Sequence, residues 1–205
     1  MSSSSNLLSA LLGNKGQFSK PKTFTHELYL NGAIGDAEDY LDWFDTIRHA
    51  SPHDEIILHI NSPGGNLFTA IQFMNAMTEC EATITAQVEG ACMSAATMIL
   101  LCCDRYMLSP HAMFMFHNYS GGSFGKGGEM WENIKYERSW SKKFLHDCYN
   151  NFLTKVEIDK MLDGKDIWLT TEQVADRLHA RQKKMLQEQH DEVMDILEEL
   201  GHEPE

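Results

Sequence analysis

Three side chains that could together perform acyl transfer occur along this sequence in the order serine, histidine, aspartate. Ser94 lies where a predicted strand passes into a helix, His117 ends an apolar strand, and Asp166 lies in a turn between two predicted helices. A histidine can take the serine proton while a carboxylate fixes the tautomer of the imidazole. The chain also holds 10 histidines and 30 acidic residues, so this spacing by itself supports the hypothesis only weakly.

Acyl transfer also needs backbone N–H groups that stabilise the developing oxyanion. Residues 61–65 (NSPGG) follow an apolar strand; their proline ends its pairing and their two glycines leave the backbone exposed. Residues 90–96 (GACMSAA) carry Ser94 to the start of a helix, where free N–H groups favour negative charge. Each segment alone also fits a simpler interpretation, an ordinary turn for the first and a helix-capping serine for the second. Cys92 is an alternative nucleophile.

Two further polar segments contain candidate residues. The loop over residues 121–127 (GGSFGKG) suggests phosphate binding, but it lacks the length of a P-loop and the Ser or Thr that should follow Lys126. Residues 163–166 (DGKD) lie in a predicted turn, and within them Asp163 competes with Asp166 for the carboxylate role.

Composition and charge exclude several classes of protein. The net charge is −13, and residues 188–205 carry eight acidic side chains with no Lys or Arg, which argues against binding nucleic acid or an anionic membrane. Five cysteines without a CxxC pair indicate reduced thiols and a cytoplasmic protein. There is no HExxH motif, which argues against a zinc hydrolase. We expect neither a metal nor a cofactor. The longest apolar run, residues 98–103, is too short to cross a bilayer.

The segments around the candidate residues alternate between strand and helix patterns, which is typical of an α/β fold with a largely parallel sheet. Strands are predicted over residues 24–30, 55–60, 82–88, 105–108 and 113–116. Helices are predicted over residues 36–49, 67–79, 95–101, 129–152, 155–162 and from 171 towards 200. Thr170 and Gln173 have the spacing of a capping box at the start of the last helix.

Four of these segments, taken together, resemble the Clp protease proteolytic subunit, ClpP. Residues 60–65 are similar to a signature of that family, residues 90–96 to its nucleophile segment, residues 115–125 to its histidine segment and residues 156–174 to its aspartate segment. Their order and spacing agree across residues 28–178. The resemblance implies a crotonase-like stack of ββα units with a handle, here the loop over residues 121–128 and the long helix over 129–152. This handle is expected to line the cleft and to join two rings.

The same resemblance assigns roles to individual residues. Ser94 is expected to be the nucleophile, His117 the general base and Asp166 the orienting carboxylate. The N–H groups of Gly65 and Ala95 are expected to form the oxyanion hole. The loop expected to bind the polypeptide substrate comprises Gly121, Gly122, Ser123, Phe124 and Gly125.

Family members form stacked heptameric rings around a chamber that an AAA+ unfoldase supplies with substrate. The resemblance therefore implies a homo-oligomer and such a partner for this chain. It also divides the chain into a flexible N-terminal arm (1–22), a peptidase domain (23–180) and an acidic helical extension (181–205). Leu186, Val193, Leu197 and Leu200 give that extension one apolar stripe.

Several positions depart from the family pattern. Ala95 stands where many members carry Met, Asn118 and Tyr119 stand where Gln-Pro is usual, and Arg177 replaces a helix-ending glycine. Helix is therefore expected where the family has a terminal strand. These departures resemble Clp-type proteases that tailed phages encode for prohead maturation, whose partner is a capsid scaffold and whose location is the host cytoplasm or the prohead interior.

Two hypotheses from other classes remain open at the level of sequence. A crotonase-fold acyl-CoA enzyme would also use glycine N–H groups as an oxyanion hole, but it needs basic residues near the CoA phosphates. A non-catalytic assembly protein could have the same fold. Candidates at all three triad positions argue against that second hypothesis.

Overall fold

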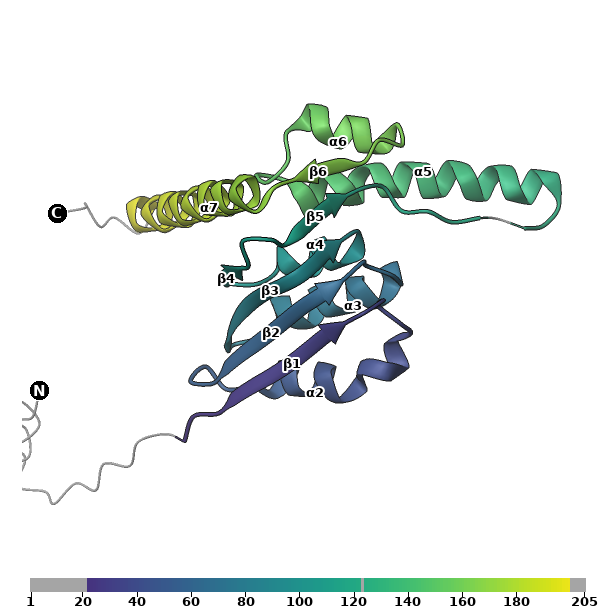
Figure 1. The fold of residues 1–205 in the computed structure, drawn as a ribbon. Coiled ribbons are helices and arrows are strands. Elements are labelled where there is room, and N and C mark those ends of the chain that lie inside the picture. The colour runs from purple at the N-terminus through teal and green to yellow at the C-terminus, as the bar shows by residue number, and fades with distance from the viewer. Residues whose placement is uncertain (1–21, 123, 200–205) are drawn as a thin grey trace, which may run out of the picture.

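A six-stranded sheet organises the described part of the chain (Figure 1). The computed structural model describes residues 22–122 and 124–199, and the side chains up to 196. The sheet order is β1-β2-β3-β5-β6, with β4 also paired to β3, and every pairing is parallel except that of β5 with β6. The strands are β1 (Thr25–Asn31), β2 (Glu55–Ser62), β3 (Thr83–Met93), β4 (Arg105–Leu108), β5 (Met113–Phe116) and β6 (Ile167–Leu169).

Helices α2, α3 and α4 pack beside the sheet, whereas α5 and α7 extend away from it in opposite directions (Figure 1). The helices are η1 (Ala37–Tyr40), α2 (Leu41–His49), α3 (Leu67–Thr78), α4 (Ala95–Leu100), α5 (Gly127–Tyr149), α6 (Lys155–Leu162) and α7 (Thr171–Glu199). The α/β class and the parallel sheet are thus confirmed. No helix within the described part of the chain is both long enough and apolar enough to cross a membrane.

Some predicted boundaries were wrong. Strand β6 was not predicted, because three residues are too few to show a period-two pattern. Helix α5 spans 127–149 rather than 129–152. At the N-cap position Asp36 makes no side-chain cap hydrogen bond, and its carboxylate instead accepts one from Asn66 Nδ2 at 3.1 Å.

Strand β3 is longer than predicted because it changes partners along its length. Its first part pairs with β4 and its last part, residues 91–93, pairs with β5. The register with β2 shifts between these parts, and the side chain of Asn61 fills the irregularity by accepting the Ala91 N–H at 3.0 Å. The end of β3 is therefore directed towards β5, which carries the next candidate residue.

The core holds the sheet against its helices through buried aliphatic and aromatic side chains. Between the sheet and the first helices, the Phe44 and Phe73 rings lie 4.7 Å apart, and both are almost fully buried. At the base of α5, Phe116 packs edge-on against Tyr149, whose hydroxyl lies 2.7 Å from Thr97 Oγ1 in α4. Each such side chain contributes about 1.5–3 kcal/mol by burial, so α5 is firmly attached at its C-terminal end.

Helix α7 replaces the terminal strand expected of the family and passes Arg177 without a break. The capping box between Thr170 and Gln173 is present at its start. Arg181 donates to the Leu101 carbonyl at 3.0 Å, so contacts between α7 and the body continue past residue 180. Helix α7 is also unbroken at residue 180, where the peptidase domain was predicted to end. Residues 1–21 of the predicted arm lie outside the described residues.

The junction of α6 and α7 rests on a bidentate ion pair. Glu157 accepts hydrogen bonds from Arg177 at 2.8 and 2.9 Å, and it also closes a capping box with Thr154. The hydrogen bonds from Arg177, together with those from Thr154, lower the pKa of Glu157 to about 2. Because this folded-state pKa lies below the usual value for Glu, the stabilisation is present above pH 4.5 and is lost as the pH falls towards 2.

We expect Glu157→Gln to lower the free energy of unfolding by about 1–2 kcal/mol at pH 7, after allowance for solvent screening. The difference from wild type should shrink as the pH falls from about 5 to about 2. Denaturant unfolding at several pH values measures it. Glu132→Gln is the matched control, since Glu132 makes only an exposed pair with Lys135. A pH-independent difference would contradict the assignment.

Candidate functional site

Ser94 forms a strained corner between β3 and α4. Its backbone adopts φ 54° and ψ −130°, a conformation that residues other than glycine rarely adopt. The Ser94 N–H donates to the Met115 carbonyl at 2.8 Å, and the Ser94 carbonyl accepts from the N–H and hydroxyl of Thr97. Ser94 occupies the N-cap position, but its hydroxyl makes no cap hydrogen bond within the described chain. The simple capping interpretation is therefore wrong.

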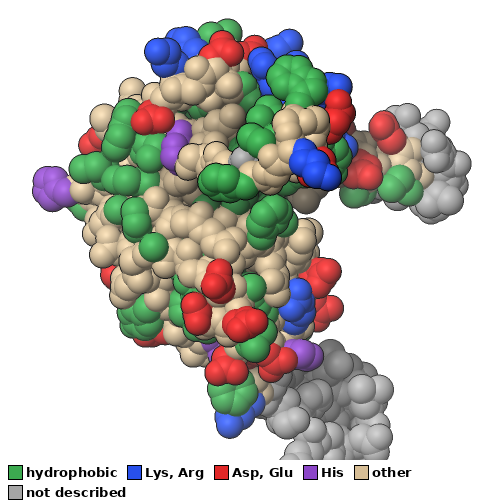
Figure 2. Space-filling view, turned by 90° about the vertical axis from the view of Figure 1, so that its right-hand side faces the viewer, with side chains coloured by type: hydrophobic (Ala, Val, Ile, Leu, Met, Phe, Trp, Pro, Cys, Tyr) green, Lys and Arg blue, Asp and Glu red, His purple; other side chains and the backbone are tan. Residues whose placement is uncertain are grey.

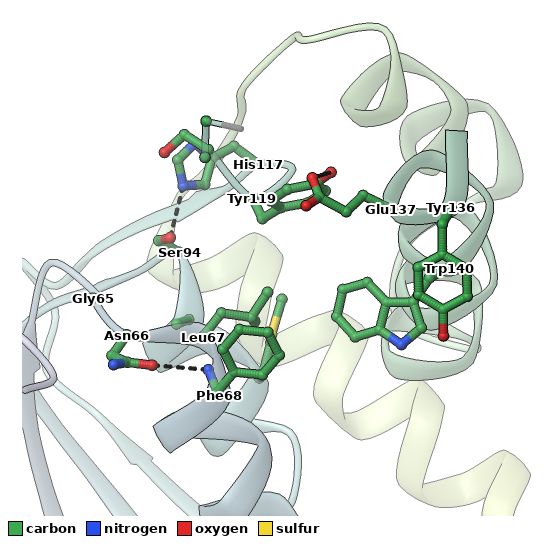
Figure 3. Close-up of a pocket in the computed structure, with 15 residues that line it drawn as sticks. Gly65, Asn66, Leu67, Phe68, Ser94, His117, Tyr119, Tyr136, Glu137 and Trp140 are labelled. Atoms are coloured by element: carbon green, nitrogen blue, oxygen red, sulfur yellow. Dashed lines mark hydrogen bonds between the residues drawn. The ribbon is translucent and has the colours of Figure 1, made fainter. Parts of the chain in front are cut away.

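The hydroxyl of Ser94 instead meets the imidazole of His117. The distance from Ser94 Oγ to His117 Nε2 is 2.7 Å (Figure 3). Strand β5 positions the histidine, because β5 pairs with the end of β3 just before Ser94. The His117 side chain is largely buried, with 28% of its surface exposed. This arrangement places an acid–base group directly against a potential nucleophile.

Asp166 lies on the other side of the same imidazole. Its Oδ1 atom lies 3.8 Å from His117 Nδ1, which is an ion-pair distance and too long for a hydrogen bond. Strand β6 explains the placement: Ile167 pairs antiparallel with Phe116, so the preceding residue lies beside His117. Among the carboxylates in the described residues, only that of Asp166 has an oxygen within 4 Å of a His117 ring nitrogen. Asp163 lies at the C-cap position of α6.

Two glycines bring the backbone after β2 against Ser94. A Cβ atom on Gly64 would lie 2.6 Å from Ser94 Cβ and 2.7 Å from the Met93 carbonyl oxygen. Gly65 forms a parallel bridge with Ile34. The Ile34 N–H donates to the Gly64 carbonyl, and the Asn66 N–H donates to the Ile34 carbonyl, both at 2.9 Å. In such a bridge the N–H of the central residue faces the opposite side, so the Gly65 N–H is directed away from Ile34.

A cavity of about 670 Å³ opens beside these groups. Six of the predicted site residues line it: Gly65, Ser94, Ala95, His117, Gly121 and Gly122. Phe124 does not, since 99% of its surface is exposed, and Gly125 is not part of the lining either. Ser123 lies outside the described residues. The predicted substrate loop therefore contributes its first two residues to the described wall.

The resemblance predicted that the helix over residues 129–152 lines the cleft, but the individual residues of the remaining wall were not predicted from the sequence. One side is formed by the start of α3, including Phe68, and the opposite side by Tyr136, Glu137 and Trp140 of α5 (Figure 3). The signal for the α5 side was present as one helical face at positions 136, 137 and 140. Such a stripe by itself is more often part of a core, and the path of α5 shows which of its residues border the cavity.

Tyr119 joins the loop after His117 to α5. Its hydroxyl donates to Glu137 Oε2 at 3.0 Å, and its ring lies edge-on to Trp140. Burial raises the pKa of Tyr119, and so does its hydrogen bond to the Glu137 carboxylate. The phenol therefore stays neutral, and it acts as a donor that fixes the carboxylate across the cavity.

Cys92, the alternative nucleophile, is completely buried beneath the site. Burial raises its pKa well above the ordinary value for a thiol, so the reactive thiolate is inaccessible. Within residues 22–122 and 124–199, no group of three or more His, Cys, Asp or Glu side chains is arranged to hold a metal ion.

Comparison with known proteins agrees with this fold and segment order. The model of the Clp protease family matches residues 27–177, well over half of the chain. The ATP-dependent Clp protease proteolytic subunit of Leuconostoc citreum is 28% identical over 130 residues, which cover 60% of this chain and 63% of that protein. The ATP-dependent Clp protease proteolytic subunit 1 of Salinibacter ruber is 28% identical over 122 residues, which cover 58% of this chain and 52% of that protein.

Structural similarity shows the same type of fold. A solved structure of a ClpP1 variant from Listeria monocytogenes has a TM-score of 0.59 to this chain at 20% identity, covering 74% of this chain and 86% of that one. The fold is therefore of the ClpP type. The chain belongs to the Clp protease family.

We expect Gly64→Ala to destabilise the protein by about 1–3 kcal/mol, because the new methyl group would overlap Ser94 and because φ is +91° at this position. Gly128→Ala is the matched control: apart from its chain neighbours and its own helix backbone, no atom of the described residues lies within 4 Å of the added Cβ, and the helical position favours alanine. Thermal and denaturant unfolding measure both variants. Equal stabilities would show that the close contact between the two segments is absent.

Proposed function

We propose that this protein hydrolyses peptide bonds as a serine endopeptidase with Ser94 as its nucleophile. The observation that carries the proposal is the 2.7 Å contact between Ser94 Oγ and His117 Nε2 at the wall of a cavity. Membership of the Clp protease family supports the same chemistry.

In the proposed reaction, His117 Nε2 takes the hydroxyl proton as Ser94 Oγ attacks the substrate carbonyl carbon. The carbonyl oxygen becomes an oxyanion that accepts hydrogen bonds from the N–H groups of Gly65 and Ala95. Both residues line the cavity beside Ser94, and Ala95 is the first residue of α4, so its N–H has no partner within the helix. His117 then gives the proton to the leaving amine, and a water that it activates hydrolyses the acyl-enzyme.

Asp166 is proposed to orient His117 and to stabilise the imidazolium. At 3.8 Å the carboxylate must move closer to accept a hydrogen bond from Nδ1. Half of the Asp166 side chain is exposed, which leaves it room to move. Catalytic hydrogen bonds often tighten only when substrate is bound.

The other two classes of function fit less well. An acyl-CoA enzyme needs cations near the CoA phosphates, but no Lys or Arg is among the described residues that line the cavity. A purely structural protein would not need a strained serine in contact with a histidine. The prohead-maturation alternative, with a capsid scaffold as its substrate, stays a prediction.

We further propose that the protein works as a ring-forming homo-oligomer in the manner of its family, with an unfoldase as a potential partner. The free half of α5 exposes apolar side chains that a neighbouring copy could cover, among them Trp131 and Ile134, which are 62% and 48% exposed. Figure 2 shows further hydrophobic side chains spread over one face of the molecule.

Native mass spectrometry with and without a fluorophosphonate probe tests the nucleophile and the assembly together. We expect a ring-sized oligomer in which wild-type subunits gain the mass of one probe, whereas Ser94→Ala subunits gain none. Assembly of the Ser94→Ala protein should be unchanged, which serves as the control. Correctly assembled wild-type protein that takes up no probe would refute the proposal.

Asp166→Asn should lower kcat/KM for a peptide substrate by about 10³-fold or more, since the imidazole loses its negatively charged partner. Asp163→Asn is the matched control, because it removes a carboxylate from the same turn but not one beside His117. We expect it to change kcat/KM by no more than a few-fold. If Asp163→Asn caused the larger loss, the carboxylate assignment would have to be reversed.

A further inference from the structure

The wall of the cavity that α5 forms carries one carboxylate among aromatic rings. Glu137 is the only formally charged side chain among the described residues that line the cavity. Around it the lining is largely aromatic, with Phe68 on the α3 side and Tyr119, Tyr136 and Trp140 on the other (Figure 3). A cavity built only to take aliphatic side chains would not need this acid, which is costly to cover without a partner.

The carboxylate of Glu137 is held in place by its neighbours. Tyr119 donates to its Oε2 atom at 3.0 Å, and the Tyr119 ring packs edge-on against Trp140 with 6.5 Å between the ring centroids. Trp140 in turn stacks on Phe144 at 4.9 Å, with the two rings nearly parallel. A ligand would therefore meet a fixed carboxylate and would lose little free energy in ordering it.

One oxygen of Glu137 remains available to a ligand. In the part of the chain that the structure describes, neither a Lys nor an Arg forms an ion pair with Glu137, and Oε1 has no hydrogen-bond partner. Its neighbours three and four positions away along α5 are Asn133, Ile134, Trp140 and Ser141, and none of these is a cation. The nearby Lys135 pairs with Glu132 instead.

We propose that this cavity is a subsite for a Lys or Arg side chain of the polypeptide substrate, with Glu137 as the residue that determines specificity. The inference rests on the proposed peptidase function. A substrate cation can form a charge-assisted hydrogen bond with the free carboxylate oxygen and lie against the faces of the aromatic rings. The apolar stem of the same side chain suits the remaining lining of Leu67, Phe68 and Met98.

The position of the subsite relative to Ser94 identifies the substrate residue that it would hold. Ser94 and His117 lie at one end of the cavity, and the α5 residues form the far wall opposite them (Figure 3). A long side chain on the residue whose carbonyl Ser94 attacks can cross the cavity towards Glu137. The net charge of −13 further favours the approach of basic peptides.

The test compares matched fluorogenic peptides that differ only in the residue before the leaving group: Arg, Lys, Leu or Phe. Wild-type protein should show a kcat/KM for Arg and Lys that is about 10-fold or more above that for Leu. Glu137→Gln should lower the Arg and Lys values by about 10- to 100-fold, the effect of losing a charge-assisted contact, so that the ratio of the Arg value to the Leu value falls towards one. Glu137→Lys should reject Arg and Lys still more strongly.

Glu132→Gln is the matched control variant, because it removes one negative charge from the same helix at a position that does not line the cavity. It should preserve the ratio of Arg to Leu. Native mass spectrometry and thermal unfolding establish that each variant assembles and folds. If the ratio is close to one in wild type, or if Glu137→Gln leaves it unchanged, the inference is wrong.

A second measurement does not depend on turnover and separates this inference from the proposed function. Peptide diphenyl phosphonates with Arg or Leu at the same position should label Ser94, and the Arg reagent should react faster in wild type but not in Glu137→Gln. Labelling at equal rates overturns the inference and leaves the serine peptidase proposal intact. No labelling by these reagents or by the fluorophosphonate overturns both.

Discussion

Ser94 holds a backbone conformation that costs on the order of 1–3 kcal/mol for a residue with a side chain, and the segments around it keep it there. The register shift in β3 directs the strand end to β5, where the Met115 carbonyl receives the Ser94 N–H. Gly64 allows the chain after β2 to lie against the serine, where any side chain would collide. The same pairing of β3 with β5 brings His117 Nε2 to 2.7 Å from Ser94 Oγ. The serine and its proposed base are therefore positioned by the same pair of strands.

Most helices and strands could be predicted from the sequence, because their apolar periodicity and capping residues are local patterns. Alternating or continuous apolar residues marked β1 to β5, and the Thr170–Gln173 capping box marked the start of α7. Strand β6 has only three residues, and it exists because Phe116 of β5 offers it a partner. The change of partner in β3 likewise depends on tertiary pairing, which no local pattern contains.

The candidate site was predictable to a similar extent. Residue types and their order suggested Ser94 and His117, and the resemblance to a family favoured Asp166 over Asp163; the geometry then places Asp166 next to the imidazole. The resemblance predicted that the helix over residues 129–152 lines the cleft, but it could not single out Glu137 and Trp140, because the direction of α5 decides which of its residues face the site. Side chains on a helix can be sorted into faces from sequence, but the surface that each face meets depends on the whole fold.

The attachment of α5 has a mechanical consequence. Near its C-terminal end Leu145, Cys148 and Tyr149 are buried, and Tyr149 contacts Thr97, whose hydroxyl in turn donates to the Ser94 carbonyl. The first turns of α5 extend from the body without support from the sheet (Figure 1). The helix is thus attached to the body at one end only, close to the proposed nucleophile. Any bending of its free end would change the width of the cleft at Tyr136 and Glu137, whereas the attached end would hold Ser94 in place.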